Sequence, residues 1–231
     1  MSERQIVAAG GALLLDTGPL KLERYILNAT GKAKPRICFV PTASGEDLSY
    51  VNRFFESYAR FGLELEVLRF FRRTPADLRD YLFGFDVVQV GGGNTRSMLA
   101  VWRHWGFDAV IREAWERGIV LCGSSAGSIC WFEEGLTDSV AGELISMDCL
   151  GFVAGSHCPH YDAEKERRPF YQRLVGNGSI RAGYACDDGA ALHYVGDRLS
   201  TIVAATPAAR AYRVEPFENG VRETVLDATV L

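Results

Sequence analysis

Short apolar runs alternate with amphipathic segments along the first half of this chain. The apolar runs have the length of strands buried on both faces, and they occupy Ile6–Ala9, Ile37–Val40, Leu63–Leu68, Val87–Val90 and Ile119–Cys122. Amphipathic helices are predicted between them at Leu20–Asn28, at Asp47–Phe61 and after Gly106. Each right-handed crossover lays its helix against the sheet, so such strands pack in parallel with helices on both faces. The pattern predicts an α/β fold, a three-layer α/β/α sandwich around a mostly parallel, doubly wound sheet.

The pattern loosens from about Leu144 onward. Shorter apolar runs occur at Ala190–Val195 and Ser200–Ala205, and Asn219-Gly220 predicts a hairpin turn, so some antiparallel edge pairing is expected there. With 231 residues, 48% of them hydrophobic, the chain can fill one core of ordinary size. Because no repeat or Pro/Ser-rich linker marks a boundary, we expect a single domain over residues 1–231.

Charge and composition exclude several classes of partner. The formal net charge is -4, and the basic residues are spread along the chain, so no nucleic-acid partner is expected. No apolar run approaches the ~20 residues of a membrane span, and Met1–Gln5 leads into a strand-like segment instead of a signal-peptide core. The six cysteines lack the C-x-x-C spacing of zinc and redox sites. We expect a cytoplasmic protein with reduced thiols and no membrane partner.

The strongest motif is Gly123-Ser124-Ser125-Ala126-Gly127, a G-x-S-x-G sequence that directly follows a predicted buried strand. This is the pattern of a nucleophile elbow, in which a strained turn exposes the serine at the carboxyl edge of the sheet. Glycines flank the serine because bulkier residues would collide with the strand. A turn without a catalytic role is the alternative, and the strand before and helix after favour the elbow. Ser125 is the predicted nucleophile, and the Ala126 N–H is a predicted oxyanion donor.

A second glycine cluster, Gly91-Gly92-Gly93-Asn94-Thr95, follows the predicted strand at 85–90. It is not a dinucleotide fingerprint, because Arg96 stands where the third glycine should be, and it lacks the lysine of a phosphate-binding loop. Three glycines do expose backbone close to a ligand, so the Gly93 N–H can supply a second oxyanion donor. A plain turn is the alternative.

Four histidines are available as a general base. His104, on a predicted helix, and His193, in a strand-like run, are expected to be structural. His157 and His160 share a loop after a predicted strand at Leu150–Ala154, which would bring them to the same sheet edge as Ser125.

At these motifs the chain resembles peptidase E, the aspartyl dipeptidases, together with the related cyanophycinases, on a class I glutamine amidotransferase-like fold. The resemblance extends from Ile37 to Leu192 and is most specific at the two glycine motifs, Pro159-His160 and Asp187-Asp188-Gly189. It implies that Ser125 is the nucleophile, that His160 is the base and that Gly93 contributes an oxyanion amide. It also implies that no metal or organic cofactor is needed. The amidotransferases carry a cysteine at the elbow, so Ser125 favours peptidase chemistry over ammonia production.

The resemblance leaves the acid of the triad open. By position it indicates Asp138, in a stretch a little past the nucleophile helix. Glu133 and Glu134 lie nearby in the sequence, and Asp162 lies two residues from His160. Only geometry can decide among them, because the acid must reach the far nitrogen of the imidazole.

The substrate implied by the resemblance is a dipeptide or short peptide with an N-terminal acidic residue. Such a substrate requires a cation in the pocket, for which the sequence offers Arg96, Arg167, Arg168 and Arg173 without ranking them. The alternatives are a cyanophycinase-like or esterase activity on the same triad, or a non-catalytic ligand-binding protein of the same fold. A homodimer is compatible with the sequence.

Overall fold

The computed structural model describes residues 3–14, 20–218 and 220–231 of the chain. Its helices are α1 (Lys21–Ala29), the 3-10 helix η1 (Thr42–Ser44), α2 (Leu48–Ala59), α3 (Leu78–Leu82), α4 (Thr95–Trp105), α5 (Phe107–Glu116), α6 (Ala126–Ile129) and α7 (Arg167–Gly176). Its strands are β1 (Gln5–Ala9), β2 (Ile37–Val40), β3 (Leu65–Val67), β4 (Val87–Val90), β5 (Val120–Ser124), β6 (Phe132–Val140), β7 (Glu143–Asp148), β8 (Val153–Cys158), β9 (Gly183–Cys186), β10 (Ala190–Val195), β11 (Arg198–Ala204), β12 (Ala211–Phe217), β13 (Gly220–Leu226) and β14 (Thr229–Val230).

The predicted parallel sheet forms the first of two sheets. In the described part of the chain this first sheet has eight strands, in the order β14-β11-β10-β1-β5-β4-β2-β3. The five strands from β1 to β3 in this order run parallel to one another. β10 runs antiparallel between β1 and β11, and β14 pairs in parallel with β11. The α/β class and the mostly parallel sheet are therefore confirmed, with antiparallel pairing where the sequence pattern loosened.

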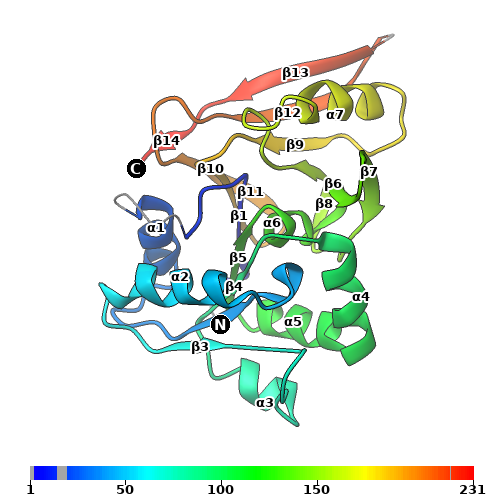
Figure 1. Ribbon diagram of the computed structural model, residues 1–231. Coiled ribbons are helices and arrows are strands. Elements are labelled where there is room, and N and C mark those ends of the chain that lie inside the picture. The colour runs from blue at the N-terminus through cyan, green and yellow to red at the C-terminus, as the bar shows by residue number, and fades with distance from the viewer. Residues whose placement is uncertain (1–2, 15–19, 219) are drawn as a thin grey trace.

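Helices cover both faces of the first sheet, since successive residues of a buried strand point to opposite sides. One face of β1, including Val7, packs with α1 and α2. The opposite face, including Ile6, packs with α3, α4 and α5. Figure 1 shows α1 and α2 on the side of the sheet away from α4 and α5. The three layers hold the parallel strands rigidly, so the loops at their ends are well positioned.

A second sheet lies beyond the carboxyl edge of the first and was not predicted from the sequence (Figure 1). Among the described residues it has six strands, in the order β13-β12-β9-β8-β6-β7. The strand expected at Leu150–Ala154 is β8, Val153–Cys158, and it pairs in parallel with β6 and β9 in this second sheet. The sequence misplaced this strand because its register is set by a ladder with distant strands, which local hydrophobicity does not encode.

The expected hairpin near the carboxyl end joins two strands of the second sheet. β12 and β13 pair antiparallel, with Phe217 opposite Gly220. Asn219, the first residue of the predicted turn, lies outside the described residues. The helix α7 packs on this sheet through Tyr171 and Val175.

No helix in the described ranges is long and apolar enough to cross a membrane.

Candidate active site

Ser125 occupies a sharp turn between β5 and α6, as the elbow motif predicts. Its backbone has φ 57° and ψ -122°, a region that a residue with a side chain rarely adopts. A Cβ on Gly123 would lie 2.4 Å from the Gly127 carbonyl oxygen, and a Cβ on Gly127 would lie 2.2 Å from the Val90 carbonyl oxygen. Both positions therefore require glycine, because the backbone at 123 lies against that at 127, and the backbone at 127 lies against the end of β4. The half-buried Ser125 is held at the carboxyl edge of the first sheet.

Two backbone amides near Ser125 have hydrogens that no described residue accepts. Neither the Ala126 N–H nor the Gly93 N–H donates to another described residue. Gly93 has φ 134°, and a Cβ there would lie 2.3 Å from the Ala43 carbonyl oxygen, so no other residue fits. A Cβ on the preceding Gly92 would lie 3.2 Å from the Ser125 Cβ, which brings the glycine loop against the elbow. Both predicted oxyanion donors thus lie beside the proposed nucleophile.

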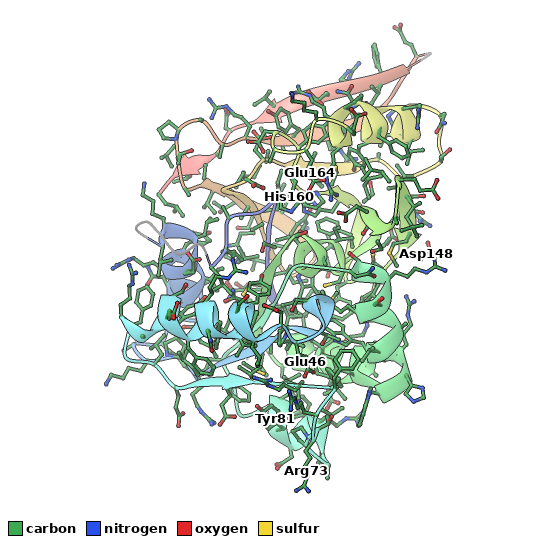
Figure 2. All side chains as sticks on the ribbon, in the orientation of Figure 1. Glu46, Arg73, Tyr81, Asp148, His160 and Glu164 are labelled. Atoms are coloured by element: carbon green, nitrogen blue, oxygen red, sulfur yellow. The ribbon has the colours of Figure 1, made fainter. Side chains whose placement is uncertain are left out.

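His160 reaches this edge from the second sheet, just beyond the end of β8. Figure 2 labels it between the first sheet and the strands above. Its Nδ1 lies 2.6 Å from Oδ1 of Asp188, in the turn between β9 and β10. The side chains are 20% and 38% exposed, so a substrate can approach while the pair stays intact. Because Nδ1 is engaged, Nε2 is the nitrogen left to exchange a proton with a hydroxyl.

The His160–Asp188 pair is held by two further contacts. The Asp188 N–H donates to Oδ1 of Asp162 at 2.9 Å. Gly11, just past β1, bridges to Asp188, and a Cβ on it would lie 2.0 Å from Asp188 Oδ1 and 2.9 Å from His160 Cε1. Only glycine leaves room for the pair at the end of β1. Asp162, one of the expected alternatives for the acid, therefore supports Asp188 without contacting the imidazole itself.

The neighbouring Asp187 has a different environment. Its Oδ2 accepts the Arg210 N–H at 3.0 Å and the Tyr212 hydroxyl at 3.3 Å. Burial raises the pKa of its carboxyl to about 6, and the negative charge of Asp162 adds to the rise. Of the two adjacent aspartates, only Asp188 contacts His160.

The structure does not bring Asp138 to His160, contrary to the sequence-based expectation. Asp138 is 63% exposed, and its carboxylate lies 3.4 Å from the guanidinium of Arg167. It belongs to β6, where alternate side chains face opposite ways. Its neighbours Thr137 and Ser139 contact the start of α4, through Thr95 Oγ1 and the Arg96 N–H. The alternation directs Asp138 toward α7 instead.

Glu133 and Glu134 are also committed elsewhere in the second sheet. Glu133 accepts the Gly155 N–H at 2.7 Å, and Glu134 accepts the Arg181 N–H at 2.7 Å. Both carboxylates pair with the Arg181 guanidinium. Neither contacts the imidazole of His160.

The other histidines lie outside this site. His193 contacts the Tyr25 hydroxyl through Nδ1 at 2.7 Å and Gln5 through Nε2 at 3.0 Å, as expected for a structural residue. His104 is exposed in the last turn of α4. His157 is fully buried in β8 and stacks on Phe132, with ring centroids 4.8 Å apart. Neither of its ring nitrogens has a partner among the described residues. His157 cannot act as the base from this position.

The burial of His157 predicts a loss of stability in acid. Desolvation lowers its pKa in the folded state from 6.5 to about 3, whereas the unfolded chain binds the proton near pH 6.5. The free energy of unfolding is therefore unaffected by this group above about pH 6.5 and falls as the pH drops toward about 3, because protons bind the unfolded chain first. At pH 5 the expected loss in the free energy of unfolding is about 2 kcal/mol. The stability difference between wild type and His157→Phe, measured by urea unfolding, should shift by this amount between pH 7.5 and pH 5.

A stability difference for His157→Phe that stays constant from pH 7.5 to pH 5 would contradict a buried neutral imidazole.

The four candidate arginines have different partners. Arg167 is buried, and it donates to Glu164 at 2.6 Å and to the Leu136 carbonyl at 3.2 Å. Arg168 pairs with Glu223, and Arg173 lies over the Phe170 ring in α7. Arg96 is exposed one residue into α4, directly after the glycine loop, and no described carboxylate pairs with it. Among the described residues, Arg96 and Arg173 pair with no carboxylate, and of these two only Arg96 directly follows the glycine cluster.

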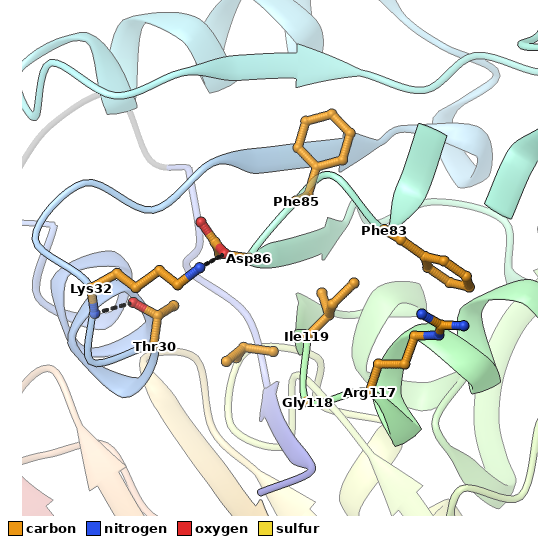
Figure 3. Close-up of a pocket in the computed structure, with 9 residues that line it drawn as sticks. Thr30, Lys32, Phe83, Phe85, Asp86, Arg117, Gly118 and Ile119 are labelled. Carbon is orange, nitrogen blue, oxygen red and sulfur yellow. Dashed lines mark hydrogen bonds and ion pairs between the residues drawn. The ribbon is translucent and has the colours of Figure 1, made fainter. Parts of the chain in front are cut away.

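A pocket of about 270 Å³, partly open to solvent, lies at the opposite edge of the first sheet (Figure 3). It is bordered by Asp86, Gly118 and Val120, at the amino ends of β4 and β5. Ligands of open α/β sheets bind at the carboxyl ends of the strands, so this cavity is not the candidate site. The described residues also hold no group of three or more His, Cys, Asp or Glu side chains suited to a metal ion.

Asp188 and Gly11 are the residues of the candidate site that sequence reasoning missed. Asp188 was visible within Asp187-Asp188-Gly189, but a separation of 28 residues from His160 gave no reason to pair them. Gly10-Gly11 directly follows the first predicted strand. Glycines in or beside a strand often mark a point where a ligand or another part of the chain lies close to the backbone. A glycine pair at a strand end was the available signal.

Comparison with known proteins identifies the family of this chain. The model of peptidase family S51 matches residues 6–202. The uncharacterized peptidase YgaJ of Bacillus subtilis (strain 168) is 46% identical over 229 residues, which cover 99% of each chain.

Two solved structures share the fold. A peptidase from an acI-B1 Actinobacterium has a TM-score of 0.71 at 17% identity, covering 98% of this chain and 95% of its own. A protein of Listeria monocytogenes EGD-e provisionally designated peptidase E has a TM-score of 0.63 at 19% identity, covering 98% and 100%. The family match and the YgaJ relative together support a peptidase, and the chain belongs to peptidase family S51.

Proposed function

We propose that the protein is a serine peptidase with Ser125 as nucleophile, His160 as general base and Asp188 as the acid. The observation that carries this proposal is the 2.6 Å contact between His160 Nδ1 and Asp188 at the sheet edge where the strained elbow presents Ser125. This arrangement leaves Nε2 of His160 free, while Ala126 and Gly93 offer two amide hydrogens. Positive φ angles at Ser125 and His160, 57° and 53°, are strain of the kind that functional sites retain.

The reaction proceeds by acyl transfer. Ser125 Oγ attacks the scissile carbonyl carbon as its proton passes to His160 Nε2, and the amides of Gly93 and Ala126 stabilise the resulting oxyanion. The carbon–nitrogen bond breaks, and His160 returns the proton to the leaving amine. Water then attacks the acyl-enzyme as His160 takes its proton. The bond between the acyl carbon and Ser125 Oγ breaks, and His160 passes that proton to Oγ, which releases the acid and restores the Ser125 hydroxyl. Asp188 holds the tautomer with hydrogen on Nδ1 throughout.

The substrate we propose is a dipeptide or short peptide with an acidic N-terminal residue, recognised by Arg96. An acidic side chain needs a cation that other carboxylates do not already neutralise. Arg167 and Arg168 each pair with carboxylates, whereas Arg96 does not pair with one in the described ranges. Arg96 also lies one residue into α4, directly after the Gly91–Thr95 cluster that carries the Gly93 amide.

A fluorophosphonate probe tests the serine chemistry. Stoichiometric labelling of Ser125, located by mass spectrometry and absent in Ser125→Ala, supports an activated serine. Failure of the native protein to label, together with no hydrolysis of any aminoacyl p-nitroanilide, would instead favour a ligand-binding protein of the same fold. Hydrolysis of simple esters without p-nitroanilides would favour an esterase.

Arg96→Gln tests the substrate class. Its kcat/KM for Asp-p-nitroanilide should fall about tenfold or more, because a charge-assisted hydrogen bond is lost, while the value for Ala-p-nitroanilide changes little. Arg173→Gln is the matched control, since Arg173 stacks on Phe170 away from the elbow. An unchanged ratio between the two substrates in Arg96→Gln would remove Arg96 as the acidic-residue reader and leave the peptidase assignment intact.

A further inference from the structure

The loop that carries Gly93 is held from outside by one tyrosine hydroxyl. Tyr50, in the first turn of α2, lies 42 residues earlier in the chain. Its hydroxyl oxygen accepts the Gly92 N–H at 3.1 Å. The phenol therefore holds the glycine loop at Gly92, where a Cβ would lie 3.2 Å from the Ser125 Cβ of the elbow.

Gly91-Gly92-Gly93 needs such an anchor. A run of three glycines has wide conformational freedom, so its backbone is not fixed by its own sequence. Only the φ and ψ of Gly92 separate the peptide held by Tyr50 from the peptide that carries the Gly93 N–H. On the far side of the loop, the Asn94 N–H donates to the Ala43 carbonyl at 2.8 Å. Contacts on both sides thus set the direction of the Gly93 N–H.

Tyr50 itself is rigidly placed. Asp47 caps α2 by accepting the Tyr50 N–H at 2.9 Å. The Tyr50 ring meets the Phe39 ring edge-on, with centroids 5.3 Å apart, and the Arg53 guanidinium lies 5.0 Å from the Tyr50 ring centroid. A Cβ on Gly91 would lie 2.9 Å from Tyr50 Cε1, so the loop packs directly on the ring. Burial raises the pKa of the Tyr50 hydroxyl, which stays neutral at physiological pH and able to accept the Gly92 hydrogen.

We propose that Tyr50 is a positioning residue whose hydroxyl orients the glycine loop so that the Gly93 N–H points at the developing oxyanion. This inference rests on the serine mechanism proposed above. Tyr50 acts through the Gly91–Gly92 peptide and makes no bond to the reacting atoms. Its contribution should therefore increase from the ground state to the tetrahedral transition state.

Tyr50→Phe removes the hydroxyl and retains the ring. We expect kcat to fall about tenfold or more with KM within about twofold, because a misdirected amide weakens the transition state more than the bound substrate. The affinity for a dipeptidyl phosphonate, a tetrahedral analogue, should fall in parallel with kcat/KM. The inhibition constant of the amine product should stay unchanged, and the shape of the pH–rate profile should also stay, since the His160–Asp188 pair is untouched.

Tyr58→Phe is the matched control on the same helix. The Tyr58 hydroxyl is buried and bonded to Gln89 Oε1 at 2.6 Å, so this variant also loses one hydroxyl hydrogen bond under α2. It should match the Tm loss of Tyr50→Phe while retaining wild-type kcat and analogue affinity. Equal kinetics in the two variants would overturn the role of Tyr50, and so would a Tyr50→Phe defect confined to KM. If the wild type neither hydrolyses p-nitroanilides nor labels with a fluorophosphonate, the serine mechanism itself fails.

Discussion

Ser125→Ala should lower kcat by about 10³-fold or more while the protein stays folded. The substitution removes one oxygen from a half-buried side chain at the turn and adds no atom, so it leaves the close contacts of Gly123 and Gly127 unchanged. Steady-state hydrolysis of a p-nitroanilide measures the loss, and thermal unfolding checks the fold. Activity within about tenfold of wild type would remove Ser125 as the nucleophile.

Combining this change with His160→Ala tests whether the two residues act as one unit. The double variant should be only slightly slower than either single variant, because the proton transfer has no purpose without the attacking hydroxyl. If the fold-decrease in kcat of the double variant equals the product of the two single decreases, Ser125 and His160 contribute independently. Such a result would contradict the base role of His160.

Asp188→Asn should lower kcat by about 10²-fold or more. The amide can present its NH₂ to Nδ1 and so favour the tautomer with hydrogen on Nε2, which cannot accept the Ser125 proton. The loss should be smaller than for a fully buried triad acid, because Asp188 is 38% exposed and water can partly replace the carboxylate. The kcat of the variant, measured beside its Tm, tests this expectation.

Asp138→Asn is the matched control for the acid. Asp138 is 63% exposed, and Arg167, 3.4 Å away, keeps its contacts with Glu164 and the Leu136 carbonyl when the Asp138 charge is removed. This variant should keep most of the wild-type kcat and Tm. A collapse of activity in Asp138→Asn beside near-normal Asp188→Asn would return the acid role to Asp138, the residue indicated by position in the sequence.

Local patterns in the sequence were enough to predict the first sheet and the elbow. The strands at Ile37–Val40 and Val87–Val90 match β2 and β4 because fully buried parallel strands are continuous apolar runs. Ser125 stood out because a strained turn needs glycines at fixed offsets from the serine, and those offsets are written in consecutive residues. His160 could be selected from only four histidines. Each of these features depends on residues that are neighbours along the chain.

Three features depend on contacts between residues distant in the chain: the carboxylate beside His160, the second sheet, and the hydrogen bond between Tyr50 and the glycine loop. Asp188 meets His160 across 28 residues, because β8 and β9 pair in a ladder that no local pattern specifies. Tyr50 meets Gly92 across 42 residues, where α2 packs over the sheet. In β6 the alternation of side chains between the two faces directs Asp138 toward Arg167 of α7, away from the site, although its position in the sequence matched that of the expected acid. The sequence alone therefore determined which residues are candidates for the chemistry. The tertiary structure decided which carboxylate contacts the His160 imidazole, because side-chain direction follows from strand register and packing.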